Sequence, residues 1–253
     1  MNSFVFVHLM GGMGNQMFQY AAGLLHKKIT NGKLYLEKAV ENPHDITDYR
    51  GLLFTNGEKY DSTLPYHISL YQNDGFASWN PNDYTFPILL LFGYFQNYSV
   101  LSPILPEFRN HMLENLSEHR NYISKKYNIK SASGFIHVRR GDYVKLKWEL
   151  DSVEYYKKAI SMFDTKTWYI VSDDIAWCKQ NFSDNFIVIE ETDPILVMAL
   201  MSLITDAAII ANSTFSWMGA YLGCGLKPNS VIYPKNWIKT GTPDLFPKEW
   251  MGI

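Results

Sequence analysis

Cysteine is scarce in this chain of 253 residues, which contains only Cys178 and Cys224. Two thiols at this separation form no metal-binding pattern and cannot staple a secreted fold, so we expect a reducing compartment. The seven histidines do not cluster at the spacing of metal ligands either. These scarcities predict a cytoplasmic protein without a bound metal.

Long apolar runs are also missing. The longest, at 87–93 and 195–204, fall well short of the ~20 residues that a membrane-spanning helix needs. Met1–Met10 is apolar but lacks the basic start of a signal peptide, so we interpret it as a first strand. The sequence thus predicts no transmembrane segment and leaves open a peripheral contact with the inner face of a membrane.

An excess of positive charge is absent as well. The 23 Lys and Arg residues are matched by 25 Asp and Glu residues, and the net charge of −2 argues against a general nucleic-acid binder. Hydrophobic residues make up 47% of the chain, which is enough for one large domain or two small ones. Because of the balanced charge, we expect no nucleic-acid partner.

The common signatures of nucleotide-binding and hydrolytic sites are missing too. The turn Gly12-Met13-Gly14 lacks the third small residue of the dinucleotide fingerprint, because Met17 occupies that position. There is no phosphate-loop lysine motif and no Gly-x-Ser-x-Gly nucleophile elbow. There is also no Asp-x-Asp triplet to bridge a metal and a diphosphate. Arginines and helix N-termini would have to meet the charge of any bound diphosphate.

The second half of the chain alternates short apolar segments with helical patterns. Continuous apolar strands separated by helices are typical of a parallel sheet covered on both faces. The predicted strands are 135–138, 168–171, 186–189, 207–210 and 231–233. Four helices are predicted between and beside them: one after Asp151, one from Ile175, one capped by Asp193 and one from Phe215.

The first half begins in the same way, with a strand at 4–9, a glycine turn and a helix from about Asn15. Between 41 and 106 turn signals and aromatic residues obscure the pattern, and 89–96 fits either a helix or a strand. Polar residues between 121 and 133 predict a boundary, which divides the chain into 1–125 and 126–253.

Four predicted strands end in polar or glycine-rich motifs. In a doubly wound sheet ligands bind outside the carboxyl ends of the strands, so these motifs predict one ligand site. The motifs are Gly11-Gly12-Met13-Gly14-Asn15, Arg139-Arg140-Gly141-Asp142, Ser172-Asp173-Asp174 and Asn212-Ser213-Thr214.

Each motif also has a purely structural interpretation. The arginine pair could lie on the surface and salt-bridge Asp142, whereas two guanidiniums at a strand end favour an anion with phosphate geometry. Asp173 or Asp174 could cap the next helix, which leaves the other aspartate for a base or a ribose. The motif 212–214 is also cap-like, yet a helix N-terminus with two hydroxyls suits an anion.

Taken in chain order, these motifs resemble glycosyltransferase family 11, the inverting α-1,2-fucosyltransferases. Gly11–Ala21 is similar to the N-terminal signature of the family. His137–Tyr143 resembles the arginine-pair motif that the family shares with α-1,6- and protein O-fucosyltransferases. Residues 172–178 and 211–217 resemble its remaining motifs, and Gly93-Tyr94-Phe95-Gln96 resembles a further family segment.

The resemblance implies an α/β, GT-B-like fold of two Rossmann-like halves with a cleft between them. The half 1–125 would be the acceptor side, and 126–253 would bind the donor. The implied donor is GDP-β-L-fucose, with no cofactor and no metal. The implied acceptor is a glycan that ends in a β-galactoside.

The resemblance also assigns roles to the motif residues. Arg140 or Arg139 would hold the β-phosphate and neutralise the leaving diphosphate, and His137 with Asp173 or Asp174 would contact the ribose or the guanine. The remaining implied donor contacts are Asn212, Ser213 and Thr214 at the phosphates, and Gly12, Gly14 and Asn15 closing over the donor, with Asn15 counted as catalytic beside the two arginines.

The general base is not identified by the resemblance. His8, at the end of the first strand, is a candidate by position, and a satisfied core histidine is the alternative. Asp142 fits better as a residue that orients an arginine. Two other functions stay open: a nucleotide-sugar transferase with another sugar or linkage, and a carbohydrate-binding protein, which would leave the arginine pair unexplained.

Overall fold

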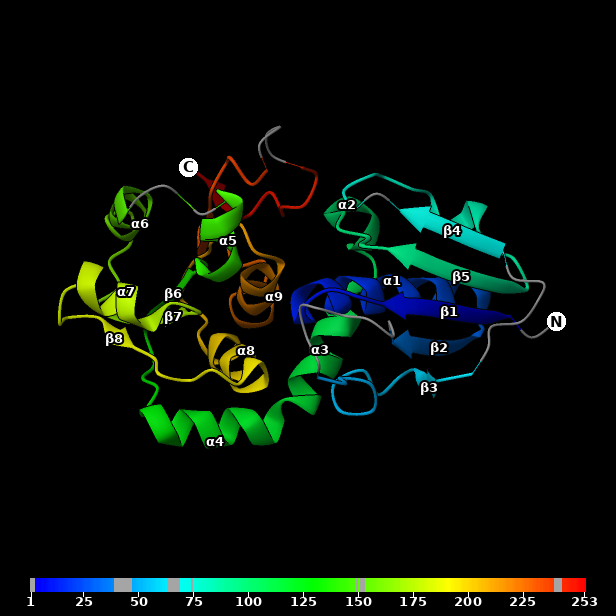
Figure 1. Ribbon diagram of the computed structural model, residues 1–253, viewed down its shortest axis with the longest axis horizontal. Helices are drawn as coiled ribbons and strands as arrows, with labels where there is room; N and C mark the ends of the chain where they lie inside the picture. The colour runs from blue at the N-terminus through cyan, green and yellow to red at the C-terminus, as the bar shows by residue number, and fades with distance from the viewer. Residues whose placement is uncertain are drawn as a thin grey trace. The chain divides into compact units, whose positions relative to one another are not determined.

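The computed structural model describes residues 3–38, 47–62, 69–73, 75–148, 150, 153–238 and 243–253. The chain divides into two compact α/β units, shown in Figure 1. Unit 1 comprises Met1–Asn115 and Pro243–Leu245, and unit 2 comprises Leu116–Thr242 and Phe246–Ile253.

Unit 1 is built on a parallel five-stranded sheet with the order β3-β2-β1-β5-β4. Its strands are β1 (Phe4–Leu9), β2 (Lys33–Lys38), β3 (Glu58–Tyr60), β4 (Ser69–Asn73) and β5 (Ile88–Gly93). Its helices are α1 (Met13–Thr30), α2 (Tyr98–Leu101) and α3 (Leu105–Asn115), with a 3₁₀ turn at Pro81–Asp83.

Helix α1 is the centre of unit 1 and packs against β1, β2 and β5. Its residues Met17, Phe18 and Ala21 are fully buried, as are Val5 and Val7 of β1. The helix ends at Asn31, which takes the left-handed conformation (φ 50°) that commonly stops a helix. The buried faces of helix and strand fix β1 in the sheet, so the turn between them is held at the carboxyl edge.

Unit 2 is built on a parallel six-stranded sheet with the order β11-β10-β9-β6-β7-β8. Its strands are β6 (Ser133–Val138), β7 (Thr167–Ser172), β8 (Ile187–Val188), β9 (Ala207–Ile209), β10 (Val231–Tyr233) and β11 (Met251–Gly252). Its helices are α4 (Ser117–Tyr127), α5 (Gly141–Leu146), α6 (Val153–Ile160), α7 (Ile175–Asn181), α8 (Pro194–Leu203) and α9 (Thr214–Gly223).

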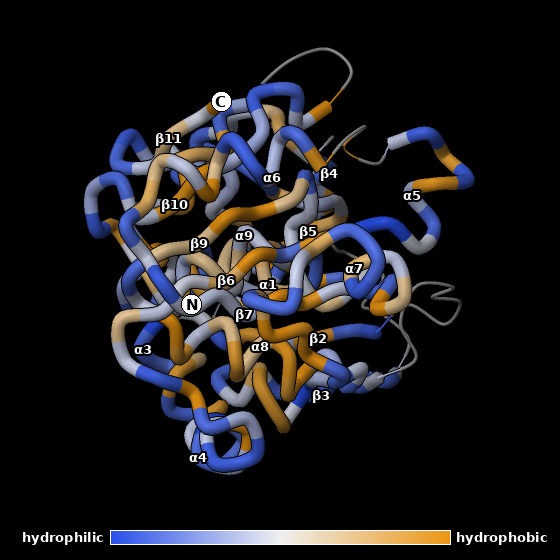
Figure 2. Tube along the Cα trace, turned by 90° about the vertical axis from the view of Figure 1, so that its left-hand side faces the viewer, coloured by the Kyte–Doolittle hydropathy of each residue, from blue (hydrophilic) through white to orange (hydrophobic). Residues whose placement is uncertain are grey.

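Every residue of β6 is buried, as expected for an inner strand of a parallel sheet that is covered on both faces. Ile136, Ile170 and Ile209, from three neighbouring strands, belong to one core cluster and are fully buried. Each such side chain contributes about 1.5–3 kcal/mol through burial. Figure 2 shows the hydrophobic residues concentrated in the strands and in α8, while α4 is largely hydrophilic.

The predicted α/β class and the five strands predicted for the second half are confirmed. The ambiguous segment 89–96 contributes a strand, β5, and the strand predicted at 186–189 shortens to β8. The sequence did not predict α5 or β11. Asp193 caps α8 as predicted, because its carboxylate accepts from the N–H of Ile195 at 2.8 Å, whereas the predicted cap at Asp151 lies outside the described residues.

The units divide between Asn115 and Leu116, whereas the sequence predicted a division between residues 125 and 126. Helix α4, which spans that position, packs against α8 and so belongs to unit 2. Near the other end of the chain, Asp244 belongs to unit 1, since its carbonyl accepts from the N–H of Tyr98 at 2.8 Å. None of the helices among the described residues has the length and apolar character needed to cross a bilayer.

Candidate functional site

Three predicted motifs meet at the carboxyl edge of the sheet in unit 2. Strands β9, β6 and β7 are neighbours, so the loops that follow them lie side by side. Arg139 reaches Asp173 across this edge at 2.9 Å, and the Tyr143 hydroxyl donates to the carbonyl of Asn212 at 3.2 Å. The structure thus connects the loops that contain the arginine pair, the two aspartates and Asn212.

Arg139 is tied down by two carboxylates. One terminal nitrogen lies 2.6 Å from Asp142 and the other lies 2.9 Å from Asp173, while the guanidinium sits 5.1 Å from the centre of the Tyr143 ring. The pair with Asp142 is the one that the structural interpretation of the sequence predicted. Both ends of the guanidinium fork are therefore engaged within the protein.

Arg140 is held differently. Its Nε lies 3.2 Å from Asp174, and its guanidinium stacks 4.4 Å from the centre of the Trp177 ring. The backbone N–H of Arg140 donates to Asp173 at 2.8 Å. Among the described residues no hydrogen-bond acceptor engages its two terminal nitrogens, and its side chain is 21% exposed. These nitrogens offer the paired donors that match a phosphate.

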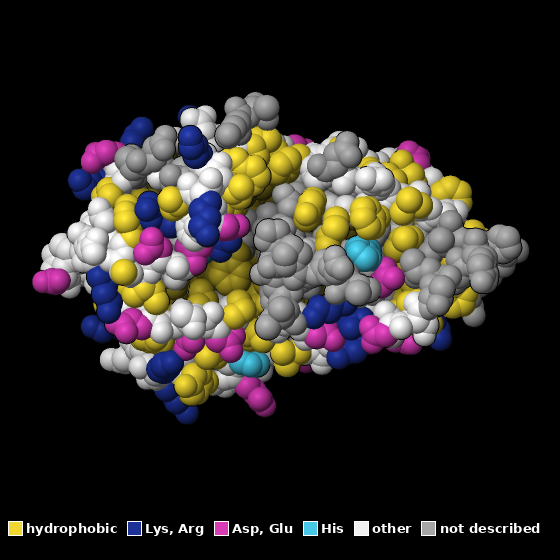
Figure 3. Space-filling model, in the orientation of Figure 1, with side chains coloured by type: hydrophobic (Ala, Val, Ile, Leu, Met, Phe, Trp, Pro, Cys, Tyr) yellow, Lys and Arg dark blue, Asp and Glu magenta, His cyan; other side chains and the backbone are white. Residues whose placement is uncertain are grey.

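The two aspartates that follow β7 divide the roles that the sequence left open. Asp174 caps α7, accepting from the N–H of Trp177 at 3.0 Å. Asp173 accepts from Arg140 and pairs with Arg139, and its carboxylate approaches Gly141 so closely that a Cβ there would lie 2.6 Å from an oxygen. Both carboxylates therefore position the arginines. Figure 3 shows acidic and basic side chains intermixed on this face of unit 2.

His137 is a buried residue of β6 and precedes Arg139 by two positions. Burial, with a smaller contribution from Arg139, lowers its pKa from 6.5 to about 3, so the imidazole is neutral near pH 7. Its Nδ1 is buried and has no hydrogen-bond partner among the described residues. The ring lies 5.8 Å from that of Phe215, on the first turn of α9.

The motif after β9 leads into α9. Ser213 is the N-cap residue by position, but its side chain makes no capping hydrogen bond. The Asn212 side chain donates to the carbonyl of Trp148 at 2.9 Å, while its own oxygen is buried without a partner among the described residues. Thr214 begins the helix. An N-terminus without a side-chain cap leaves backbone donors for an anion.

In unit 1 the glycine turn lies at the end of β1. Gly11 has φ +75°, and a Cβ there would lie 2.6 Å from the side-chain nitrogen of Asn15. Gly12 is the N-cap of α1 and Gly14 lies in its first turn, so Gly12, Gly14 and Asn15 form one group. Gln96 donates to the Asn15 side-chain oxygen at 2.9 Å. All of these residues belong to unit 1.

Three residues that hold these groups were not named as site residues from the sequence: Tyr143, Trp177 and Gln96. Each nevertheless lies inside or beside a motif quoted for the family resemblance. Tyr143 and Trp177 face the two guanidiniums, and Gln96 orients Asn15. The sequence motifs therefore include these three residues, but only the folded structure shows which groups they contact.

Comparison with known proteins adds family and fold. A family model described as "Glycosyl transferase family 11" matches residues 2–253. The "O-antigen biosynthesis glycosyltransferase WbnK" of Escherichia coli is 28% identical and covers 90% of this chain and 93% of its own length. An "Alpha-1,2-colitosyltransferase" of Escherichia coli is 27% identical and covers 99% of each.

Among solved structures, POFUT1 in complex with GDP-fucose superposes with a TM-score of 0.58 at 12% identity, covering 92% of this chain and 98% of that one. At this identity the likeness concerns the fold alone. The fold of this chain is GT-B-like, as predicted.

Proposed function

This chain belongs to glycosyl transferase family 11, and from that membership we propose that it transfers L-fucose from GDP-β-L-fucose to the 2-hydroxyl of a terminal β-galactoside. The product is α-1,2-linked, because the acceptor oxygen attacks the anomeric carbon from the face opposite the leaving GDP. The observation that carries the proposal is Arg140, whose terminal donors face no acceptor among the described residues and lie at the end of the central strand.

The chemistry of the donor side follows from this arrangement. As the bond from the anomeric carbon to the diphosphate breaks, negative charge grows on GDP. Arg140 stabilises that charge through its terminal nitrogens, with Ser213, Thr214 and the first N–H groups of α9 as further donors. Since the charge is stronger in the transition state than in the bound donor, this interaction raises kcat. Arg139, fixed by Asp142 and Asp173, supports Arg140 by completing the charged network.

The nucleoside end of the donor lies, in this proposal, against His137 and the aspartates. A neutral imidazole with an unpartnered Nδ1 suits a hydrogen bond to a ribose hydroxyl or the guanine. On the acceptor side, we assign Asn15, Gly12 and Gly14 to the proposed site, and Gln96 holds the Asn15 side chain in place. No metal is required in this scheme, because guanidinium and helix N–H groups meet the diphosphate charge.

A thermal-shift panel of GDP, UDP, CMP and GDP-fucose, each with and without EDTA, tests the donor. A ligand that binds only the folded state stabilises it by roughly 2.7 kcal/mol at about a hundred times its dissociation constant. We expect GDP and GDP-fucose to stabilise the protein equally well in EDTA. Stabilisation by UDP or CMP instead, or loss of the effect in EDTA, would refute the proposed donor site. NMR analysis of the product linkage then tests the acceptor.

A second donor sugar is favoured by one comparison. The relative named as an α-1,2-colitosyltransferase matches this chain over its whole length. Fucosyl and colitosyl donors can be separated by direct competition: equal amounts of both GDP-sugars are offered with one galactoside, and the product masses are compared. An excess of the colitosyl product would identify colitose, and not fucose, as the sugar that this enzyme transfers. The proposed linkage would stay the same.

We also propose cytoplasmic action with peripheral contact to an anionic membrane surface. In support, the segment around α5 exposes Val144, Leu146 and Trp148, which alternate with Lys145 and Lys147, a combination typical of membrane-interface segments. Sedimentation with vesicles containing anionic lipid tests the contact. We expect W148A combined with K145E and K147E to abolish binding, and equal binding by this variant and the wild type would refute it.

A further inference from the structure

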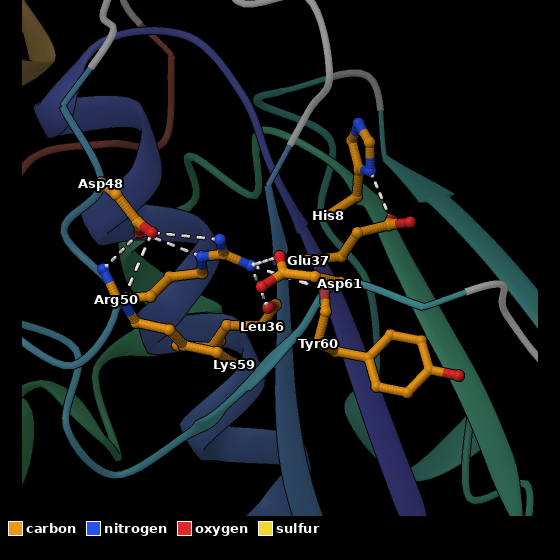
Figure 4. A network of polar contacts seen from close by, with 8 residues as sticks. All are labelled: His8, Leu36, Glu37, Asp48, Arg50, Lys59, Tyr60 and Asp61. Carbon is orange, nitrogen blue, oxygen red and sulfur yellow. Dashed lines mark hydrogen bonds and ion pairs between the residues drawn. The ribbon is translucent and has the colours of Figure 1, made fainter.

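A histidine and a glutamate form a pair at the carboxyl edge of the sheet in unit 1. His8 and Glu37 are register partners on the neighbouring strands β1 and β2, and the His8 Nδ1 lies 2.6 Å from a Glu37 carboxylate oxygen. Their side chains are 22% and 23% exposed, so solvent or a ligand can reach both. Figure 4 shows one ring nitrogen facing Glu37 and the other pointing away from it.

The strand ends that carry this pair are locked by a buried arginine. Arg50 is 6% exposed and donates to the carbonyls of Leu36 at 3.1 Å and Tyr60 at 3.4 Å, next to Glu37 and at the end of β3. Its charge is satisfied by Asp48 at 3.0 Å and Asp61 at 2.6 Å (Figure 4). A buried guanidinium is tolerated only with such partners, so this network holds the edge of β2 in one geometry.

The ring of His8 is fixed from the other side as well. Phe92 of β5 lies with its ring centre 5.1 Å from that of His8. The described charged groups on the adjoining strand ends are Glu37 and Lys38 of β2, with the Arg50–Asp61 pair beyond them, while β5 presents the uncharged Phe92. Among the residues that the structure describes, Glu37 is thus the charged group that contacts the imidazole.

From this geometry we infer that His8 is the general base of the proposed transfer and that Glu37 is its positioning residue. The inference rests on the proposed function and adds the group that accepts the acceptor's proton. Nδ1–H donates to Glu37, which leaves the lone pair of Nε2 for a substrate hydroxyl. Ligands bind at the carboxyl ends of parallel strands, which is where this nitrogen lies.

The step balances without a further reactant. The acceptor hydroxyl gives its proton to His8 Nε2 as its oxygen forms the bond to the anomeric carbon. The bond from that carbon to the diphosphate breaks, and GDP leaves with the electron pair. Glu37 stabilises the imidazolium that forms, and the proton then passes to solvent.

The alternative is an ion pair that only joins two strands. Partly exposed pairs of this kind contribute about 0–1 kcal/mol to stability, so removing a pair with only this role would leave catalysis intact. A general base contributes about 10²–10⁴-fold to the rate. Kinetics therefore separates the two explanations cleanly.

The test compares His8→Gln, His8→Asn and Glu37→Gln with two controls from unit 1, His111→Gln and Glu58→Gln. His111 bonds Tyr20 at 3.1 Å within the helical layer, and Glu58 is an exposed residue at the start of β3. For each variant kcat, KM for both substrates, the pH–rate profile and the melting shift with GDP are measured.

We expect both His8 variants to lose about 10²–10³-fold in kcat, with the GDP shift retained and the acid limb of the profile abolished. Glu37→Gln should lower kcat less and displace that limb to lower pH, because a neutral amide stabilises an imidazolium less. A loss below about threefold in both His8 variants, or equal losses in the controls, would overturn the inference. Absence of transfer by the wild type would instead refute the proposed function.

Discussion

Replacing Arg140 by alanine gives the sharpest test of the donor side, because the structure separates its effect on stability from its effect on rate. The side chain contributes one ion pair to Asp174 at 3.2 Å, between groups that are 21% and 34% exposed. Such a pair is worth about 0.2–1 kcal/mol, and the stack on Trp177 adds about 0.5–1 kcal/mol. The variant should therefore remain folded.

The rate should change far more. Removing one donor that stabilises the leaving charge costs on the order of 10²–10³ in kcat. Arg139→Ala should cost less in kcat, because both terminal nitrogens of Arg139 are already occupied by Asp142 and Asp173. Arg140→Lys is the matched control for charge: it keeps the cation and loses the planar fork, so it should recover only part of the rate.

Single-turnover kinetics with saturating GDP-fucose measures the chemical step, and a urea titration measures the stability of each variant. A loss of less than about tenfold in both Arg139→Ala and Arg140→Ala would refute the assignment of either arginine to the leaving diphosphate. A loss in Arg140→Ala that is matched by a loss of GDP binding and of folded protein would refute the separation of rate from stability.

The remaining predictions concern pH and backbone geometry. Burial lowers the folded-state pKa of His26 from 6.5 to about 4 and that of His137 to about 3. As the pH falls below 6.5, protons therefore bind the unfolded chain before the folded one. Each histidine should then reduce the free energy of unfolding by about 1.4 kcal/mol per pH unit, down to its folded pKa. Urea titrations at pH 7 and pH 5 measure this loss, and equal stability at both pH values would contradict it. Gly11→Ala should lower the melting temperature and kcat together, because φ is +75° and the new Cβ would lie 2.6 Å from the Asn15 amide. Gly12→Ala, where a Cβ would meet nothing within 4 Å, is its control for stability, and similar melting temperatures for the two variants would count against this explanation.

The strands of unit 2 could be predicted because their environment is uniform. β6 is buried along its whole length and its neighbours β7 and β9 cover it on both sides, so each appears in the sequence as a short apolar run. Unit 1 gave a weaker signal, because its outer strands β3 and β4 are partly exposed and mix polar with aromatic residues. Helix α5 was not predicted since it is short and has no buried residue, which leaves no periodic pattern.

The positions of the site residues could be predicted from strand ends, whereas their partners could not. Nothing local in the sequence distinguishes Arg139 from Arg140, yet the fold gives one guanidinium two carboxylates and leaves the terminal nitrogens of the other open. The same holds for His8, whose partner Glu37 lies on another strand and was not considered as a site residue from the sequence. Pairings between strand ends depend on register, which the sequence alone does not contain.

The charges around the arginine pair bear on how the proposed donor is recognised. Two guanidiniums lie among three carboxylates, those of Asp142, Asp173 and Asp174, so the site carries no excess of positive charge to attract a diphosphate from a distance. Recognition must then depend on the direction in which hydrogen-bond donors point. The donors are the terminal N–H groups of Arg140 and the backbone N–H groups at the start of α9, where the Ser213 side chain forms no cap. Such a site favours a ligand whose oxygens fit fixed donors over any polyanion of sufficient charge. That preference agrees with a chain whose net charge is −2.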